Sequence, residues 1–193
     1  EVGFGKLFLQ ASAYRCVFSC APDRRIGGPG RSVLAVRGEI GVARGFSRPI
    51  VNQDGTLGTV ADLPASQRFF AGGSTTVRGF QLDRLGVPAV LTTDGLPFGG
   101  NGLVVLNAEL RTVVGKLLRR NLSTVQFADG GNVFAKTGDI RLGQLRATLG
   151  TGVRYDSPIG PIRLDFGFKL SRLLVGGRRE RGWEYHLSFG EAF

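Results

Sequence analysis

Methionine is absent from the sequence, histidine and tryptophan occur once each, and only two of the 193 residues are cysteines. Cys16 and Cys20 are too sparse a pair for a disulfide scaffold or a four-ligand metal site. They lie close together near a turn, so they can form a local disulfide in an oxidising compartment or have no role. We expect no metal and no other cofactor.

The motifs of the common hydrolases and nucleotide-binding proteins are also missing. The single histidine, His186, stands near Glu184 and Ser188, so a Ser-His-acid set can be drawn. However, the sequence has neither a G-x-S-x-G elbow nor an oxyanion-hole motif. The glycine-rich stretches at 27–30 and 72–73 lack the G-x-x-x-x-G-K-[ST] spacing of a phosphate-binding loop. We therefore predict that the protein is not an enzyme.

Long hydrophobic runs are absent too. No uninterrupted apolar run reaches about 18 residues, so no transmembrane helix is expected. With 31 glycines, 42% apolar residues and a mean hydropathy of +0.05, the composition does not favour a helical bundle. The strands of a membrane barrel alternate apolar with polar residues and score weakly on hydropathy, so the composition leaves a barrel open.

The formal net charge of +10 suggests a nucleic-acid partner at first sight. The basic residues are spread along the chain, however, and many alternate with apolar neighbours. No RNP-like aromatic motif, basic helix or zinc-ligand spacing accompanies them. We expect no binding to nucleic acid.

Alternation of apolar and polar residues is the main pattern that the sequence does contain. Most of the alternating segments are about 9–12 residues long, which exceeds the length of typical soluble strands and suits a tilted bilayer crossing. Short turns on one side and long loops on the other are typical of outer-membrane barrels. The sequence thus predicts an all-β, antiparallel transmembrane barrel portion with apolar residues facing lipid; the alternative is a soluble sandwich. The predicted strands are 3–17, 31–44, 103–113, 122–127, 145–156, 162–170 and 183–193.

The longest connection, residues 45–102, carries no sustained strand or helix period. Within it, the segment 68–80 has a Gly72-Gly73 pair, and Arg78 is the only charge at its centre. Glycines allow the backbone to turn sharply and approach other groups closely. An arginine that is carried inward on such a loop needs carboxylate partners. We predict that this loop folds back against the sheet.

The residues Val77, Arg78, Gly79 and Phe80 resemble the VRGF/Y signature of the BamA/TamA superfamily of outer-membrane assembly and secretion barrels. The stretches 152–165 and 185–193 are similar to that family's next-to-last hairpin and closing strand, and the three motifs follow the family's order. The resemblance implies a sixteen-stranded barrel preceded by POTRA domains. The chain, which begins at Glu1, is then expected to be one domain, 1–193, a fragment that supplies the last seven strands. Residues 45–102 become an extracellular loop that tucks into the barrel.

The resemblance also implies that Arg78 pairs with Glu109 and Asp129 in the lumen. Glu109 lies on the polar face of its predicted strand, which agrees with this role. Asp129 shares its alternation parity with the apolar Val125 and Phe127, so we expect a bulge nearby that re-aims it. The alternative is that these residues are ordinary solvated lumen charges.

The closing strand is expected to act as the signal by which barrel-assembly machinery recognises a client, a role compatible with lipid-facing packing. Its apolar residues alternate, and Gly190 is expected to weaken pairing near a barrel seam. The residues concerned are Tyr185, Leu187, Phe189, Gly190 and Phe193.

The resemblance implies a location in the outer membrane of Gram-negative bacteria and a role in inserting or translocating other proteins. Expected partners are the lipid bilayer and unfolded β-barrel or secreted client proteins. A second chain that completes the barrel is a further expected partner, because seven strands leave open edges that cost several kcal/mol per unpaired group in lipid. The alternatives are a two-partner or patatin-type secretion barrel and a passive pore.

Overall fold

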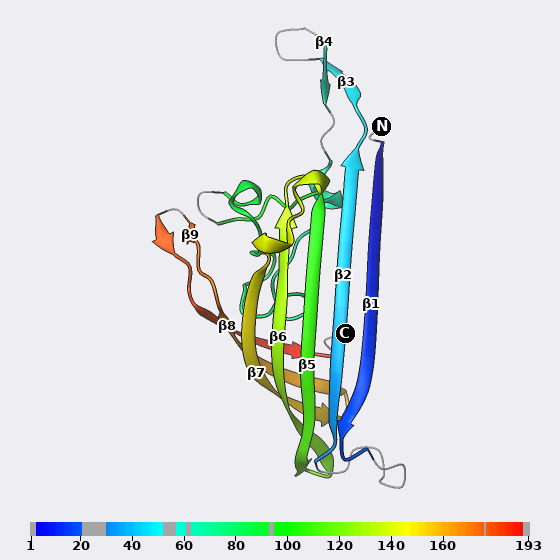
Figure 1. The fold of residues 1–193 in the computed structure, drawn as a ribbon, viewed down its shortest axis with the longest axis vertical. Helices are drawn as coiled ribbons and strands as arrows, with labels where there is room; N and C mark the ends of the chain where they lie inside the picture. Colours follow the sequence, from blue (N-terminus) through cyan, green and yellow to red (C-terminus); the bar gives the residue numbers. More distant parts are fainter. Residues whose placement is uncertain are drawn as a thin grey trace.

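One antiparallel sheet of seven strands dominates the structure, a computed structural model that describes residues 3–20, 30–51, 57–60, 63–92, 95–175 and 177–190 (Figure 1). The sheet curves but does not close, since β1 and β11 each keep one edge unpaired within the described residues. This confirms the predicted all-β antiparallel architecture. In sheet order, the strands are β1 (Phe4–Phe18), β2 (Ser32–Gly45), β5 (Gly102–Leu117), β6 (Arg120–Phe134), β7 (Arg146–Ser157), β8 (Gly160–Lys169) and β11 (Trp183–Phe189).

Short elements occupy the connections. The loop for which no strand was predicted carries the hairpin β3 (Arg48–Val51) and β4 (Leu57–Val60), which extends beyond the end of the sheet in Figure 1. Four-residue strands are too short to produce a clear period, which is why the sequence pattern missed them. The remaining elements are β9 (Leu174–Val175), β10 (Arg178–Arg179), and the 3₁₀ turns η1 (Ala65–Gln67), η2 (Pro88–Val90), η3 (Thr137–Asp139) and η4 (Leu142–Gln144).

Strand β6 is longer than predicted. A turn was expected after Phe127, yet the strand continues to Phe134 and pairs with β5 without interruption at Gly130 and Gly131. Gly131 serves close packing instead, because a Cβ there would lie 2.7 Å from the carbonyl oxygen of Val104. The expected bulge at this point is therefore wrong. Within the β5–β6 pair, the register shifts near Gly115.

The two faces of the sheet have opposite character. On β8, the side chain of Leu164 is 51% exposed, whereas Arg163 and Asp165 on either side of it are 1% and 0% exposed. A soluble sandwich would bury the leucine and expose the charges. The inverted pattern therefore argues against the soluble alternative. No helix in the described part of the chain is long and apolar enough to cross a membrane.

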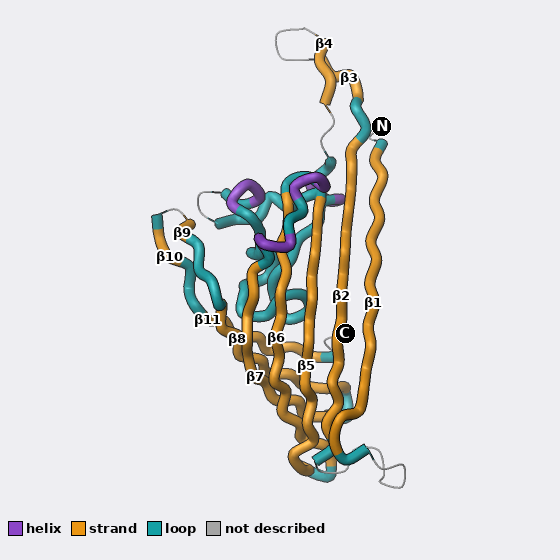
Figure 2. The backbone as a smooth tube through the Cα atoms, viewed as in Figure 1, coloured by secondary structure: helices purple, strands orange, loops and turns teal. Residues whose placement is uncertain are grey.

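The hydrophobic core lies between the long loop and the concave face of the sheet. Figure 2 shows much of the loop beside the strands within the curve of the sheet, with the 3₁₀ turns near the upper ends of the strands. Phe69 packs against β2, where a Cβ on Gly41 would lie 2.6 Å from its ring. The loop thus packs on the sheet as predicted. The buried core residues include Leu63, Phe69, Val77, Phe80 and Leu85 of the loop and Leu103, Val105 and Val133 of the strands.

Candidate functional site

The loop segment 71–80 forms a compact turn that presents Arg78 to the sheet. The amide of Gly73 donates to the carbonyl oxygen of Phe80 at 3.0 Å, and the amide of Gly72 donates to Oγ1 of Thr76 at 2.8 Å. Gly72 and Gly73 have φ of 113° and 102°, a conformation that residues with a Cβ rarely adopt. The glycine pair therefore makes the reversal of the chain that aims Arg78 inward.

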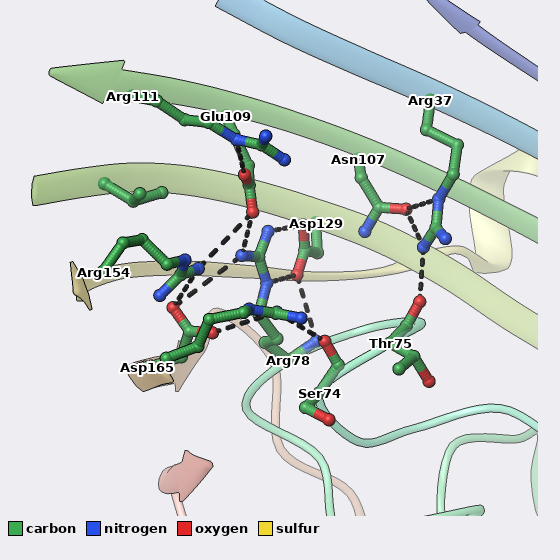
Figure 3. A network of polar contacts seen from close by, with 12 residues as sticks. Arg37, Ser74, Thr75, Arg78, Asn107, Glu109, Arg111, Asp129, Arg154 and Asp165 are labelled. Carbon is green, nitrogen blue, oxygen red and sulfur yellow. Dashed lines mark hydrogen bonds and ion pairs between the residues drawn. The ribbon is translucent and has the colours of Figure 1, made fainter. Parts of the chain in front are cut away.

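Arg78 lies at the centre of a charge cluster (Figure 3). Its Nε lies 2.7 Å from Oδ2 of Asp129 and its Nη2 lies 2.8 Å from Oδ1, a bidentate contact. Its backbone amide donates to the same carboxylate at 3.0 Å, and its Nη1 pairs with Glu109. The guanidinium carbon also lies 3.7 Å from the centre of the Phe127 ring. The structure thus brings together the three residues that the sequence singled out.

The electrostatics of this cluster keep Arg78 charged. The residue is only 1% exposed. Burial acts to lower the pKa of the guanidinium, but the hydrogen bond and charge of Asp129, together with Glu109, outweigh burial. The pKa therefore lies above its ordinary value. Removing one partner of such a buried ion pair typically costs about 3–5 kcal/mol.

Further charges that were not predicted complete the cluster. Asp165 lies 3.9 Å from Nη1 of Arg78, 2.7 Å from Nη2 of Arg154 and 3.3 Å from Nη2 of Arg163. Arg111 contacts the other side of Glu109, with its Nε 2.7 Å from Oε2. The sequence did show that these residues occupy the polar positions of the alternating apolar and polar pattern of their strands. The sequence did not show that β5, β6 and β8 bring their acids to one point.

A second set of contacts holds the loop just before Arg78. Nη2 of Arg37 donates to the carbonyl oxygen of Thr75 at 2.5 Å, and Nδ2 of Asn107 donates to that of Thr76 at 2.6 Å. Arg37 and Asn107 are joined by a hydrogen bond of 3.0 Å from Nε to Oδ1. Strands β2 and β5 therefore hold the backbone of the loop while β5, β6 and β8 surround its arginine.

The other residues of the loop motif pack closely against the sheet. Val77 and Phe80 are 0% and 1% exposed, and the cations of Arg146 and Lys169 lie 4.5 Å and 4.6 Å from the centre of the Phe80 ring. The amide of Gly79 donates to Nε2 of His186 on β11 at 3.1 Å. All four motif residues therefore contribute to seating the loop.

The closing strand presents its apolar residues outward. Tyr185, Leu187 and Phe189 are 58%, 64% and 68% exposed. Gly190, with φ of 92°, follows the last residue of β11, and its amide still donates to the carbonyl oxygen of Pro161 at 2.9 Å. Phe193 lies outside the described residues.

Two remaining candidates concern cysteine and metal chemistry. Cys16 and Cys20 form a disulfide at the end of β1, with their Cα atoms 5.9 Å apart. In the described part of the chain, no group of three or more histidine, cysteine and acidic residues could hold a metal ion. Oγ of Ser188 makes no hydrogen bond to any described residue, so it is not paired with His186 as a nucleophile would be. The charge cluster around Arg78 therefore serves to hold the loop in place.

Comparison with known proteins gives consistent matches. The Omp85 superfamily domain matches residues 4–193. The outer membrane protein assembly factor BamA of Neisseria meningitidis serogroup B is 26% identical over 166 residues, which cover 72% of this chain and 19% of that protein. The crystal structure of BamA from Haemophilus ducreyi lacking POTRA domains 1-3 matches with a TM-score of 0.65 and 19% identity, over 94% of this chain and 34% of that one. The chain spans about a fifth of the length of the curated relative, and the structural match shows a shared fold.

Proposed function

Because the chain belongs to the Omp85 superfamily, we propose that it is the part of an outer-membrane barrel that inserts or translocates β-rich client proteins by strand pairing at a weak edge. This activity uses no nucleotide, no metal and no chemical catalysis. In this proposal, residues 1–193 are the C-terminal unit of a larger barrel, and residues 45–102 form an extracellular loop that closes over its lumen.

The family match and the shared fold confirm the BamA/TamA-type barrel that the VRGF motif and the two later motifs predicted. They also agree with a location in the bacterial outer membrane. The seven strands are a portion of such a barrel, and the described sheet is open. Further strands, from the same chain or from a second copy, are proposed to pair with its free edges, since unpaired backbone groups in lipid cost several kcal/mol each.

The observation that carries the proposal is the character of β11 as an edge. It is seven residues long, shorter than the other strands of the sheet, and in the described residues it pairs with β8 alone. The chain leaves the extended conformation directly after it, at Gly190. An edge strand presents unpaired backbone N–H and C=O groups that can bind an incoming strand, and the short β11 has few hydrogen bonds to β8 that hold it in place. The alternating outward residues Tyr185, Leu187 and Phe189 match the expected signal strand.

The charge cluster around Arg78 supports the same activity by keeping the loop seated while an edge opens. Its partners Glu109 and Asp129 lie on β5 and β6, in the middle of the sheet and away from either edge. A client strand can therefore pair with or leave the free edge of β11 while the contacts of Arg78 with Glu109 and Asp129 stay intact. The carboxylates of Glu109, Asp129 and Asp165 offset most of the positive charge of the arginines around them, which disfavours the anion-conducting passive pore.

Two variants of the full-length protein, reconstituted in lipid vesicles, test the proposal. Replacing Arg78 with alanine removes the bidentate partner of the buried Asp129 and one of the partners of Glu109, so we expect the loop to loosen. Cleavage by chymotrypsin, which cuts after the loop phenylalanines, is expected to rise several-fold, and insertion of a client barrel is expected to fall. The variant itself should still insert, as its heat-modifiable gel mobility will report. Arg84→Ala is the matched control, because Arg84 is an exposed arginine on the same loop.

Wild-type levels of both loop cleavage and client insertion in Arg78→Ala would contradict the proposal. Release of an attached passenger without insertion of separate client barrels would favour the secretion barrel. Ion conductance that persists without either activity would favour the passive pore.

A further inference from the structure

One hydrogen bond joins the loop to the edge strand. The backbone amide of Gly79 donates to Nε2 of His186 at 3.1 Å, across 107 residues of sequence. His186 is half-buried on the lumen side of β11 and lies opposite Asp165 in the β8–β11 register. The loop that is anchored on the middle strands is thus also bound to the strand at the free edge.

The backbone around Gly79 is shaped to bring this amide within reach. Gly79 has φ of 89°, and it lies directly against Gly167 of β8, where a Cβ would be 2.7 Å from the Gly79 nitrogen. Two glycines therefore let the loop pass over β8 at backbone distance. The amide that follows Arg78 consequently points past β8 to the imidazole on the next strand.

Nε2 of His186 can accept this hydrogen bond only when the imidazole ring is neutral. Nε2 of a histidine accepts a hydrogen bond when the ring is neutral and its proton is on Nδ1; in the imidazolium both nitrogens are donors. Protonation would therefore set a ring N–H against the Gly79 amide and break the contact. The charged groups facing the ring are Glu184 on its own strand, Asp165 and Arg163 on β8, and Arg78 on the loop.

We propose that His186 is a positioning residue that couples the loop to the edge strand β11, and that protonation of its ring releases the loop from this strand. The inference rests on the proposed function only in taking β11 as the edge at which clients pair. When the His186 ring is neutral, its hydrogen bond to Gly79 holds the loop at a fixed distance from β11. In the protonated state, β11 moves independently of the loop, whose arginine stays bound to β5 and β6.

Distances between spin labels in the full-length protein test the coupling directly. One label is placed at Thr75→Cys, on the exposed side of the loop, and the other at Tyr185→Cys, on the outer face of β11. At about pH 8 we expect a single narrow distance distribution. At acidic pH, where the ring is protonated, we expect the population at other distances to rise roughly five-fold, as the loss of one hydrogen bond allows.

Three variants separate positioning from a general structural effect. His186→Gln keeps an acceptor but does not titrate, so its distribution should stay narrow at both pH values. His186→Leu removes the acceptor and should give the broad distribution at both. Ser188→Ala changes the same face of β11 at a hydroxyl that makes no hydrogen bond to the described residues, and it should behave as wild type. A wild-type distribution that is unchanged by pH and by His186→Leu would overturn the inference. Because the labels report without any client, this result is independent of whether the proposed insertion activity is found.

Discussion

The concave side of β8 and the concave side of β1 belong to one sheet but differ in burial. On β8, Arg163 and Asp165 are almost completely buried beneath the loop and ion-paired. On β1, Lys6, Gln10 and Ser12 face the same side and are exposed. The described part of the loop covers the middle strands and leaves most of β1 open. The loop, more than the sheet, therefore turns lumen charges into buried charges that need partners.

On the convex side, apolar side chains are exposed across the whole width of the sheet. Leu7 on β1, Leu149 on β7 and Leu187 on β11 are 54%, 49% and 64% exposed, although they lie on edge and middle strands alike. Lipid solvates these side chains, so they need no covering element. Contact of the convex side with lipid can therefore be tested by introducing a charged residue there. Packing of the loop on the concave side can be tested separately, by replacing a glycine beneath the loop with alanine.

The largest effect is expected for Leu164→Arg, at the middle of β8 on the convex side. An arginine on the lipid face near the bilayer midplane costs about 2–4 kcal/mol. Urea-induced unfolding of the full-length protein in lipid vesicles should show this loss. Leu142→Arg, at a 71% exposed leucine in the η4 turn outside the sheet, is the control and should change little. Equal losses in both variants would show that the convex side does not face lipid.

A smaller effect is expected for Gly167→Ala on the concave side. The added Cβ would lie 2.7 Å from the nitrogen and 2.8 Å from the Cα of Gly79, and backbone atoms cannot move aside cheaply. Such overpacking typically costs about 1–3 kcal/mol. We expect faster chymotrypsin cleavage of the loop with the sheet intact. Gly115→Ala on β5, where no atom lies within 4 Å of the added Cβ, should leave cleavage unchanged. Unchanged cleavage in Gly167→Ala would mean that the loop does not seat on β8.

The smallest effect is expected at the rim of the sheet, the end at which the β9–β10 hairpin connects β8 to β11. Glu180 holds this hairpin through its contacts with Arg146 and with the amide of Leu173. Burial acts to raise the pKa of Glu180, but hydrogen bonds from Arg146 and from the amide of Leu173 outweigh it and hold the pKa below its ordinary value. A lowered folded-state pKa means that the stabilisation is complete above the unfolded pKa of about 4.3 and is lost as the pH falls through the folded value.

The protection of the hairpin amides against hydrogen exchange, relative to the intrinsic rate at each pH, should therefore be high at neutral pH and fall below about pH 4. Glu180→Gln should show low protection at every pH, because the charge is gone. Equal protection of the wild-type hairpin at both pH values would show that this ion pair does not hold the rim.

The strands and their two faces could be predicted because alternation records which side of each strand meets lipid. The prediction failed at Val125 and Phe127, which were taken as apolar and therefore lipid-facing. Both are buried on the concave side, and the guanidinium carbon of Arg78 lies 3.7 Å from the centre of the Phe127 ring. Asp129 shares their side without any bulge. A lumen that is filled by a loop contains apolar surface, so apolar character alone does not identify the lipid face.

The outer part of the charge cluster could not be predicted, for a reason that lies in the register. Arg154 and Arg163 stand opposite each other on β7 and β8, a repulsive pair that Asp165, Glu109 and the loop make tolerable. Which residues stand opposite depends on turn lengths and strand pairing, which local sequence does not fix to within one residue. The contact between Gly79 and His186 depends on the same register and was likewise not expected.

The coupling between Arg78 and Asp129 is the most direct test of the claim that an ion pair seats the loop. A double-mutant cycle with Arg78→Ala, Asp129→Ala and the double variant, measured by urea-induced release of the loop in the full-length protein, isolates it. We expect each single variant to lose about 3 kcal/mol or more and the double variant to lose little beyond that, a coupling near the top of the usual range of about 0.5–3 kcal/mol. Losses that add to within about 0.5 kcal/mol would contradict the claim.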